Sequence, residues 1–263
     1  MNSFAKIMER TVLPYLDKRA EHYLWRRKNL NYDARENGEF EILTRLMKAD
    51  IKIVFDVGAN QGLWTRENQS LFPSAHIHAF EIIPSTFQIL KKNTDGLDRV
   101  SCNSFGLSDR DGNTVAYTHP TASELATTTS GGPAIHHTDF TQLEVQVRTG
   151  DAYCREQAIQ KINFLKIDAE GAEGAILAGF SQMLDQNSIE VIQFEYGMAN
   201  IYSRFLLTDF YSLLSSKGFL IGKLFPRGVR FQPYNPEMED FRGPNFVAVH
   251  QTKPELIKLL AEA

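Results

Sequence analysis

The sequence predicts a doubly wound α/β fold built on a parallel sheet. From Ile51 onward, short apolar runs that end in an acid or a glycine alternate with helical stretches, as in the strand-helix units of such a sheet. The 263 residues and 43% hydrophobic content are enough to bury the core of one large domain. The alternation is interrupted once, which we interpret as an insertion into a single domain.

Five strands are expected in the alternating region, and two more follow it. The expected strands are Lys52 to Val57, His76 to Glu81, Val100 to Leu107, Ile162 to Asp168, Ile189 to Glu195, Phe219 to Leu224 and Phe246 to His250. The helices expected with them are Leu63 to Leu71, Pro84 to Asn93, Ala152 to Gln160, Ala172 to Met183 and Thr208 to Lys217. A Pro/Gly-rich loop through Pro244 separates the last two strands.

Residues 1–48 precede the alternation and are expected to form a helical extension. Their apolar side chains recur at loosely helical spacing, which predicts two or three helices acting as a lid or a dimer surface. The run Tyr23-Leu24-Trp25-Arg26-Arg27-Lys28 could form a basic-aromatic surface for a membrane or an anionic acceptor. A solvated helix face is the commoner arrangement. Peripheral membrane contact and a homodimer both stay open.

The insertion covers residues 113–149 of a main domain expected at 49–252, before a C-terminal helix over 253–263. Thr114 to Thr118 and Leu143 to Val147 alternate like the strands of a hairpin. Between them, the Thr/Ser/Gly-rich stretch Thr127 to Pro133 is expected to be a mobile loop.

The overall charge argues against polyanionic partners. A formal net charge of −4 and a pI near 6.0 give no general attraction to nucleic acid. The N-terminus lacks a basic start followed by an apolar run, and no window reaches the length of a transmembrane segment. We therefore expect a cytoplasmic protein without nucleic-acid partners.

A glycine-containing loop after the first strand predicts a nucleoside site. Asp56 closes that strand, and Gly58 and Gly62 allow a tight turn where a ligand can approach the backbone. Glu81 ends the next strand 23 residues past Gly58, where a carboxylate accepts hydrogen bonds from ribose hydroxyls. Acids at strand ends also cap helices, but the combination favours a cofactor.

Charge separates the two nucleoside cofactors that could use this arrangement. A dinucleotide favours the spacing G-x-G-x-x-G for its pyrophosphate, which is absent here. S-adenosylmethionine carries a sulfonium cation, which nearby carboxylates attract. The acids at or just past predicted strand ends are Asp56, Glu81, Asp109, Asp168 and Glu170. A nicotinamide-dependent oxidoreductase is therefore the weaker alternative, and a non-catalytic cofactor-binding scaffold is a second one.

Four segments carry a resemblance to a known family. They are Phe55-Asp56-Val57-Gly58-Ala59-Asn60-Gln61-Gly62, Ala79-Phe80-Glu81, Leu107-Ser108-Asp109-Arg110-Asp111-Gly112 and Phe164-Leu165-Lys166-Ile167-Asp168-Ala169-Glu170-Gly171-Ala172-Glu173. Together they resemble the FkbM family of S-adenosylmethionine-dependent methyltransferases, from about Ile51 to Tyr196. The resemblance implies a mostly parallel seven-stranded class I (Rossmann-like) sheet with an antiparallel strand near its end.

The resemblance also implies site roles. The loop from Asp56 through Gly58 and Asn60 to Gly62 would surround the methionine end of the cofactor, and Glu81 would bind the ribose. Ser108 and Asp109 would neighbour the adenine, while Asp168 and Glu170 would line the side facing the methyl group. The sequence departs from the family at Glu81-Ile82-Ile83-Pro84, where a proline more often follows the acid directly. Family members methylate mostly hydroxyls of sugars and natural products, which implies O-methylation of a small molecule or glycan.

The proton of the acceptor hydroxyl needs a base, and several residues qualify. His136 and His137 lie in the insertion and could titrate near neutral pH, although exposed loop histidines are at least as common. Asp168, Glu170 and Glu195 are alternatives at strand ends. Asp168 with Glu195 could instead hold a divalent metal, but no third ligand is evident, so we expect a metal-free site. Glu195 and Tyr196 are the expected acceptor contacts.

Overall fold

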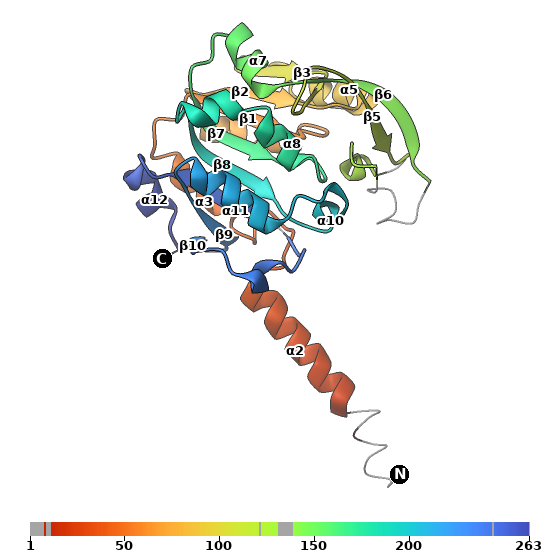
Figure 1. Cartoon of the computed structure of the whole chain (residues 1–263), viewed down its shortest axis with the longest axis vertical. Helices are drawn as coiled ribbons and strands as arrows, with labels where there is room; N and C mark the ends of the chain where they lie inside the picture. Colours follow the sequence, from red (N-terminus) through yellow and green to blue (C-terminus); the bar gives the residue numbers. More distant parts are fainter. Residues whose placement is uncertain (1–7, 9–11, 121, 131–138, 244, 263) are drawn as a thin grey trace.

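The computed structural model describes residues 8, 12–120, 122–130, 139–243 and 245–262. Figure 1 shows a body of sheet and helices from which one long helix, α2 (Leu13–Lys28), projects. His136 and His137 lie outside the described residues.

Five parallel strands form one part of the central sheet. They are β1 (Ile53–Val57), β2 (His76–Phe80), β3 (Val100–Asn103), β7 (Ile162–Ile167) and β8 (Ile189–Glu195). Strand β1 pairs with β2 on one side and with β7 on the other. The strand order reverses at β1 and β7, and ligands of doubly wound sheets bind at such a reversal.

Three further strands complete the central sheet. Strand β11 (Asn245–His250) runs antiparallel between β8 and β9 (Phe219–Phe225), which confirms the antiparallel strand near the end. The sequence predicted seven strands in the central sheet, whereas the described part of the structure has eight. Strand β10 (Gly228–Phe231), inside the expected Pro/Gly-rich loop, pairs with β9 through a tight turn at Pro226-Arg227 and forms an eighth, edge strand.

Two apolar layers cover the two faces of the sheet. Phe55 and Leu165 belong to a cluster that includes Phe180 and Phe210, whereas Val54 and Phe164 belong to a cluster on the opposite face. Neighbouring residues of one strand point to opposite faces, so buried clusters on both sides confirm the doubly wound architecture.

Helices cover both layers. They are α3 (Glu39–Leu46), α4 (Leu63–Asn68), α5 (Pro84–Asn93), α7 (Gly150–Glu156), α8 (Glu173–Ala178), α9 (Ser181–Asp185), α10 (Ala199–Ser203), α11 (Leu207–Ser216) and α12 (Pro254–Leu260), with single turns η2 (Gln69–Leu71), η3 (Ser123–Leu125) and η4 (Pro236–Met238). The expected helix Ala172 to Met183 is divided at Gly179 and Phe180. A Cβ at Gly179 would lie 2.0 Å from the Ser108 carbonyl oxygen, and the Asp151 carboxylate accepts the amides of Gln182 and Met183 at the start of α9.

The insertion forms a second, three-stranded sheet. Strands β5 (Gly112–Thr118) and β6 (Thr141–Arg148) pair antiparallel, as the hairpin pattern predicted, and β4 (Gly106–Leu107) pairs with β6. The expected strand Val100 to Leu107 is therefore wrong as a single element. The chain leaves the central sheet after β3, where the Phe105 ring packs against Phe80.

The two N-terminal helices differ in their contacts. Helix α3 buries Ile42, Leu43 and Leu46 in the same cluster as Leu256 and Leu260 of α12. None of the described side chains of α2 is buried. Within the described ranges, no helix is both long enough and apolar enough to pass through a bilayer.

Candidate functional site

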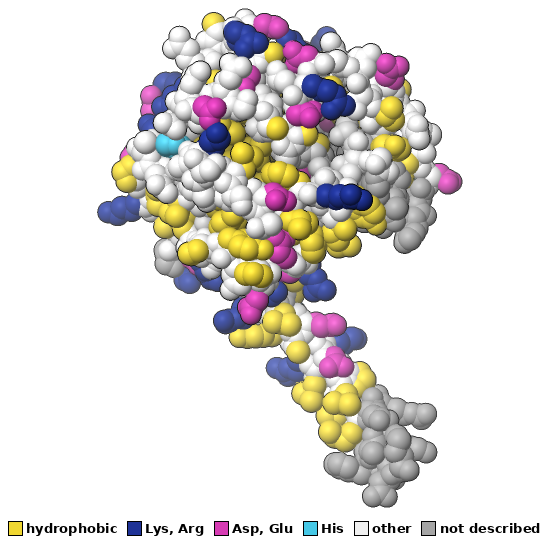
Figure 2. All heavy atoms as spheres, in the orientation of Figure 1, with side chains coloured by type: hydrophobic (Ala, Val, Ile, Leu, Met, Phe, Trp, Pro, Cys, Tyr) yellow, Lys and Arg dark blue, Asp and Glu magenta, His cyan; other side chains and the backbone are white. Residues whose placement is uncertain are grey.

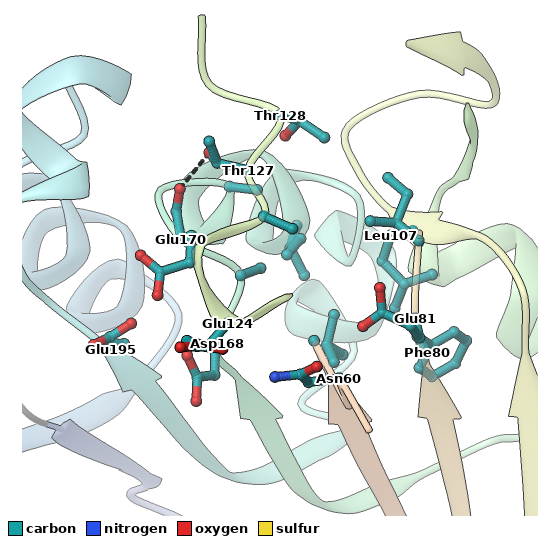
Figure 3. Close-up of a pocket in the computed structure, with 18 of the residues that line it drawn as sticks. Asn60, Phe80, Glu81, Leu107, Glu124, Thr127, Thr128, Asp168, Glu170 and Glu195 are labelled. Carbon is teal, nitrogen blue, oxygen red and sulfur yellow. Dashed lines mark hydrogen bonds between the residues drawn. The ribbon is translucent and has the colours of Figure 1, made fainter. Parts of the chain in front are cut away.

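A pocket of about 440 Å³ opens at the carboxyl ends of β1, β2, β7 and β8 (Figure 3). This volume is within the range of small-molecule sites. Its lining comes from the strand ends, the insertion and the segment after α2. The lining residues are Tyr32, Val57, Gly58, Asn60, Phe80, Glu81, Ile82, Gly106, Leu107, Ser123, Glu124, Ala126, Thr127, Thr128, Asp168, Ala169, Glu170, Ala172, Ile176 and Glu195.

Gly58 fixes the floor of the pocket. It has a φ of +82°, and an added Cβ would lie 1.8 Å from the Asp168 carbonyl oxygen. The amides of Gly58 and Ala59 both donate to the Phe80 carbonyl oxygen, at 3.1 and 2.9 Å. Only glycine tolerates this approach at that φ, so the ends of three strands meet closely here. Gly62, expected to bind the cofactor, instead begins α4 and lies against Leu90, outside the lining.

The insertion supplies one wall of the pocket. The Ser123 hydroxyl donates to Asn60 Oδ1 at 2.8 Å, and the Thr127 hydroxyl donates to the Glu170 carbonyl oxygen at 2.6 Å (Figure 3). Asn60 thus lines the pocket and is held by a residue more than 60 positions away in the chain, while its contact with the cofactor stays a prediction. Thr127 is buried and hydrogen-bonded, so the start of the expected mobile loop is fixed; residues 131–138 lie outside the described part of the chain.

Glu81, the predicted ribose ligand, lines the pocket and is 6% exposed. Burial raises the pKa of its carboxyl to about 7, although its Oε1 accepts the Ile83 amide at 2.8 Å. At the departure from the family pattern, Ile82 lines the pocket and Pro84 begins α5. Hydroxyl groups that donate hydrogen bonds to this carboxyl would favour its ionised form.

Three carboxyl groups gather on the opposite side of the pocket. Oxygens of Asp168, Glu170 and Glu195 lie within 4.8 Å of one another. Burial raises the pKa of Glu170 to about 8, and the neighbouring charge of Asp168 adds to the shift. Burial also raises the pKa of Glu195 well above its ordinary value, again with Asp168 nearby. The cluster therefore favours the arrival of a positive charge.

Lys166 balances part of this charge from below the pocket. Its ammonium lies 3.0 Å from Asp168 Oδ2 and 3.6 Å from Asp56 Oδ1. Although burial disfavours the charged form of Asp168, this cation holds the pKa of Asp168 below its usual range. Asp56 is fully buried, its Oδ2 accepts the Thr65 hydroxyl at 2.6 Å, and it is not among the residues that line the pocket. A direct contact of Asp56 with the cofactor stays a prediction.

Glu173 shapes the loop that carries Asp168 and Glu170. It is 1% exposed, and its Oε1 accepts the amides of Ala169 and Gly171, both at 3.1 Å. Burial raises its pKa to about 7. The loop turns through left-handed backbone at Glu170, where φ is +48°. The second glutamate of the Ala-Glu-Gly-Ala-Glu motif thus folds the loop, and the first faces the pocket.

Three further predicted site residues lie outside the pocket lining. Ser108 and Asp109 are close to the surface, where Asp109 pairs with Arg110; Gly106 and Leu107 line the pocket in their place. Tyr196 is fully buried among Phe210, Phe241 and Phe246, and its hydroxyl donates to Glu239. Side chains alternate along the chain at the end of β8, so Glu195 faces the pocket and Tyr196 faces the core.

The sequence patterns did not predict the placement of Tyr32, Ser123 and Thr127 on the pocket or the role of Lys166. A lysine between Leu165 and Ile167 in a fully buried strand was a visible sign that it has an acidic partner. The position of Tyr32 on the pocket depends on how the N-terminal segment packs, which no local pattern encodes. The structure also adds Glu170 as the third carboxylate near Asp168 and Glu195; whether methyl transfer is metal-free stays a prediction.

Comparisons with known proteins agree with the geometry. Residues 56–221 match the model of the methyltransferase FkbM domain. The chain is 29% identical over 202 residues to the 2-O-methyltransferase NoeI of Sinorhizobium fredii, covering 72% of this chain and 80% of that protein. It is 24% identical over 193 residues to Methyltransferase 1 of Beauveria bassiana, covering 65% and 74%.

Solved structures with a similar fold include the precorrin-6Y C5,15-methyltransferase of Geobacter metallireducens (TM-score 0.44, 12% identity, 80% of this chain and 85% of that chain). They also include the N-terminal domain of human METTL16 (TM-score 0.44, 12% identity, 81% and 68%).

Proposed function

Because the chain belongs to the FkbM methyltransferase family, and is therefore a methyltransferase, we propose that it transfers the methyl group of S-adenosylmethionine to a hydroxyl group of a sugar, glycoconjugate or natural product. The carboxyl-rich pocket at the ends of β1, β2, β7 and β8 carries the proposal. The 2-O-methyltransferase activity named for the relative from Sinorhizobium fredii supports oxygen as the methyl acceptor.

The described residues fit this cofactor. Glu81 would accept the ribose hydroxyls, and Gly106 and Leu107 would lie against the adenine. Asp168 and Glu170 would lie near the sulfonium, which supplies the electrophilic methyl carbon when the cofactor is bound. A pyrophosphate would face these same carboxyl groups and be repelled, so the donor set disfavours a dinucleotide.

Glu170 is the base that we assign to the acceptor proton. Its carboxyl lines the pocket beside Glu195, and its pKa of about 8 is close to the working pH, where a base transfers protons most efficiently. A neighbouring positive charge would favour its ionised form. His136 and His137 stay predictions, because they lie outside the described residues. Holding donor and acceptor in line would contribute up to about 7–11 kcal/mol to the rate.

The first experiment tests the cofactor site. Glu81→Ala removes a charged hydrogen-bond acceptor, so the affinity for S-adenosylhomocysteine should fall by roughly 10- to 100-fold in calorimetry. Asp109→Ala is the matched control and should bind as the natural chain does, because Asp109 lies outside the pocket lining. Unchanged binding in Glu81→Ala, or weakened binding in Asp109→Ala, would contradict this placement of the cofactor.

The second experiment tests the base. Glu170→Gln keeps the size of the side chain and should lower kcat by roughly 100-fold or more while leaving S-adenosylhomocysteine affinity nearly unchanged. In the natural enzyme kcat/KM should rise with pH through about 8, as Glu170 loses its proton. Methyl transfer into sugars, lipid-linked glycans and polyketides provides the assay. Full activity of Glu170→Gln would remove this residue from the mechanism.

A further inference from the structure

Helix α2 exposes an unusual amount of apolar surface. Six of its large apolar or aromatic side chains are between 40% and 59% exposed, and none of the described side chains of this helix is buried. These residues are Leu13, Tyr15, Leu16, Tyr23, Leu24 and Trp25. Figure 2 shows hydrophobic side chains near the base and toward the far end of the projecting helix, with basic and acidic side chains between them. Large exposed apolar side chains gathered on one element mark an interaction site.

The apolar side chains are not spread evenly around α2. With about 100° of rotation per residue, a strip forms from Leu13, Leu16, Ala20, Tyr23 and Leu24. Arg19 and Arg26 lie along one edge of the strip, and Arg27 lies at its end. An apolar strip with tyrosine and with arginine along its edge is typical of helices that lie in the interface of a membrane.

The charge of α2 is opposite to that of the chain. The helix holds five basic residues and two acids, whereas the formal net charge of the whole chain is −4. Its basic residues are Lys18, Arg19, Arg26, Arg27 and Lys28. A basic helix on an acidic protein complements a negatively charged surface.

The base of α2 is fixed to the rim of the pocket. The Asn29 side chain donates to the carbonyl oxygens of Asn37 and Leu224, at 2.7 and 2.9 Å, and Lys28 pairs with Asp240 at 3.2 Å. Tyr32, just beyond, lines the pocket, and its hydroxyl accepts the Gly243 amide at 3.1 Å. A surface bound by α2 would thus be held at a set distance from the pocket opening.

We propose that α2 docks the enzyme on an anionic phospholipid surface. The apolar strip would enter the interface between headgroups and acyl chains, and the arginines would contact lipid phosphates. Parallel pairing with α2 of a second copy fits less well, because Arg27 lies in line with Leu16 and Tyr23 and would face the Arg27 of the other helix. A membrane-associated acceptor would follow from this docking; that consequence rests on the proposed function.

The test is co-sedimentation of the full chain with vesicles. The chain should bind vesicles of phosphatidylcholine mixed with phosphatidylserine and bind vesicles of phosphatidylcholine alone far more weakly. Arg19→Ser/Arg26→Ser/Arg27→Ser should weaken binding by on the order of a hundredfold. Leu16→Ser/Tyr23→Ser should weaken it as well, because the apolar strip is interrupted. Lys91→Ser/Lys92→Ser, on the exposed end of α5, is the control and should bind as the natural chain does.

Two results would overturn the proposal. One is equal sedimentation of the natural chain and the arginine variant with the mixed vesicles. The other is a natural chain that is dimeric in analytical ultracentrifugation, fails to bind vesicles, and becomes monomeric in Leu16→Ser/Tyr23→Ser. Calorimetry with S-adenosylhomocysteine on the same variants tests the cofactor site independently. A failure of the membrane-docking proposal can therefore be told apart from a failure of the proposed function.

Discussion

Lys166 offers the sharpest test of how the pocket floor is held together. In Lys166→Met the ammonium between Asp56 and Asp168 is lost, and the fully buried Asp56 keeps only the Thr65 hydroxyl as a hydrogen-bond partner. At 3.6 Å and an effective dielectric constant of about 20, the pair of Lys166 and Asp56 interacts by roughly 5 kcal/mol. Without the lysine, the free-energy cost of removing its ammonium from water is no longer incurred, which offsets part of the lost attraction.

We therefore expect Lys166→Met to lower the free energy of unfolding by about 3–5 kcal/mol, as for other broken buried pairs. Urea unfolding followed by circular dichroism measures it. Asp56→Asn/Lys166→Met removes both charges and should be more stable than Lys166→Met alone. Lys223→Met is the control, since that buried ammonium donates to the Arg242 carbonyl oxygen, at 3.3 Å, instead of a carboxylate; it should cost about 1 kcal/mol. A loss below about 1 kcal/mol in Lys166→Met, with additive effects in the double variant, would refute this reasoning.

Two further predictions concern the same region. Burial raises the pKa of Glu81 and Glu173 to about 7 and of Glu170 to about 8, above their unfolded values, so the cofactor-free fold is favoured while they hold protons. Its free energy of unfolding should fall as the pH rises from about 5 to 8, by up to about 1.4 kcal/mol per pH unit for each group. The Tm should fall with it, and a rising Tm would contradict these shifts. Gly58→Ala should cost about 3 kcal/mol or more and abolish S-adenosylhomocysteine binding, because its Cβ would meet the Asp168 carbonyl oxygen. Gly96→Ala has a similar φ of +78° in open space and should cost only about 1 kcal/mol, so equal losses in urea unfolding would show that the contact is unimportant.

Residues placed by strand position were predictable from the sequence. Gly58, Glu81, Asp168 and Glu170 follow the ends of apolar runs, and parallel strands bring such ends to one edge of the sheet. The strand-end side of the pocket therefore follows from periodicity, whereas the walls formed by Tyr32 and the insertion depend on distant contacts.

Residues placed by strand pairing or by side-chain direction could not be predicted from the sequence in the same way. Asp56 and Lys166 are register partners in β1 and β7, which fixes their contact. The register of two paired strands cannot be read from the sequence of either strand alone. Ser108 and Asp109 were misplaced because the chain leaves the sheet at Phe105. Tyr196 was misplaced although alternation after Glu195 already directs it to the core.

The carboxyl cluster has a consequence for turnover. Within the described part of the chain, Lys166 is the only basic residue that pairs with Asp168, and no base pairs with Glu170 or Glu195. In the proposed reaction the donor enters as a cation and leaves as a neutral thioether. The attraction that captures the donor thus disappears at the moment of transfer, which would promote product release and limit product inhibition. Loss of the acceptor proton from Glu170 to solvent would then reset the pocket for the next donor.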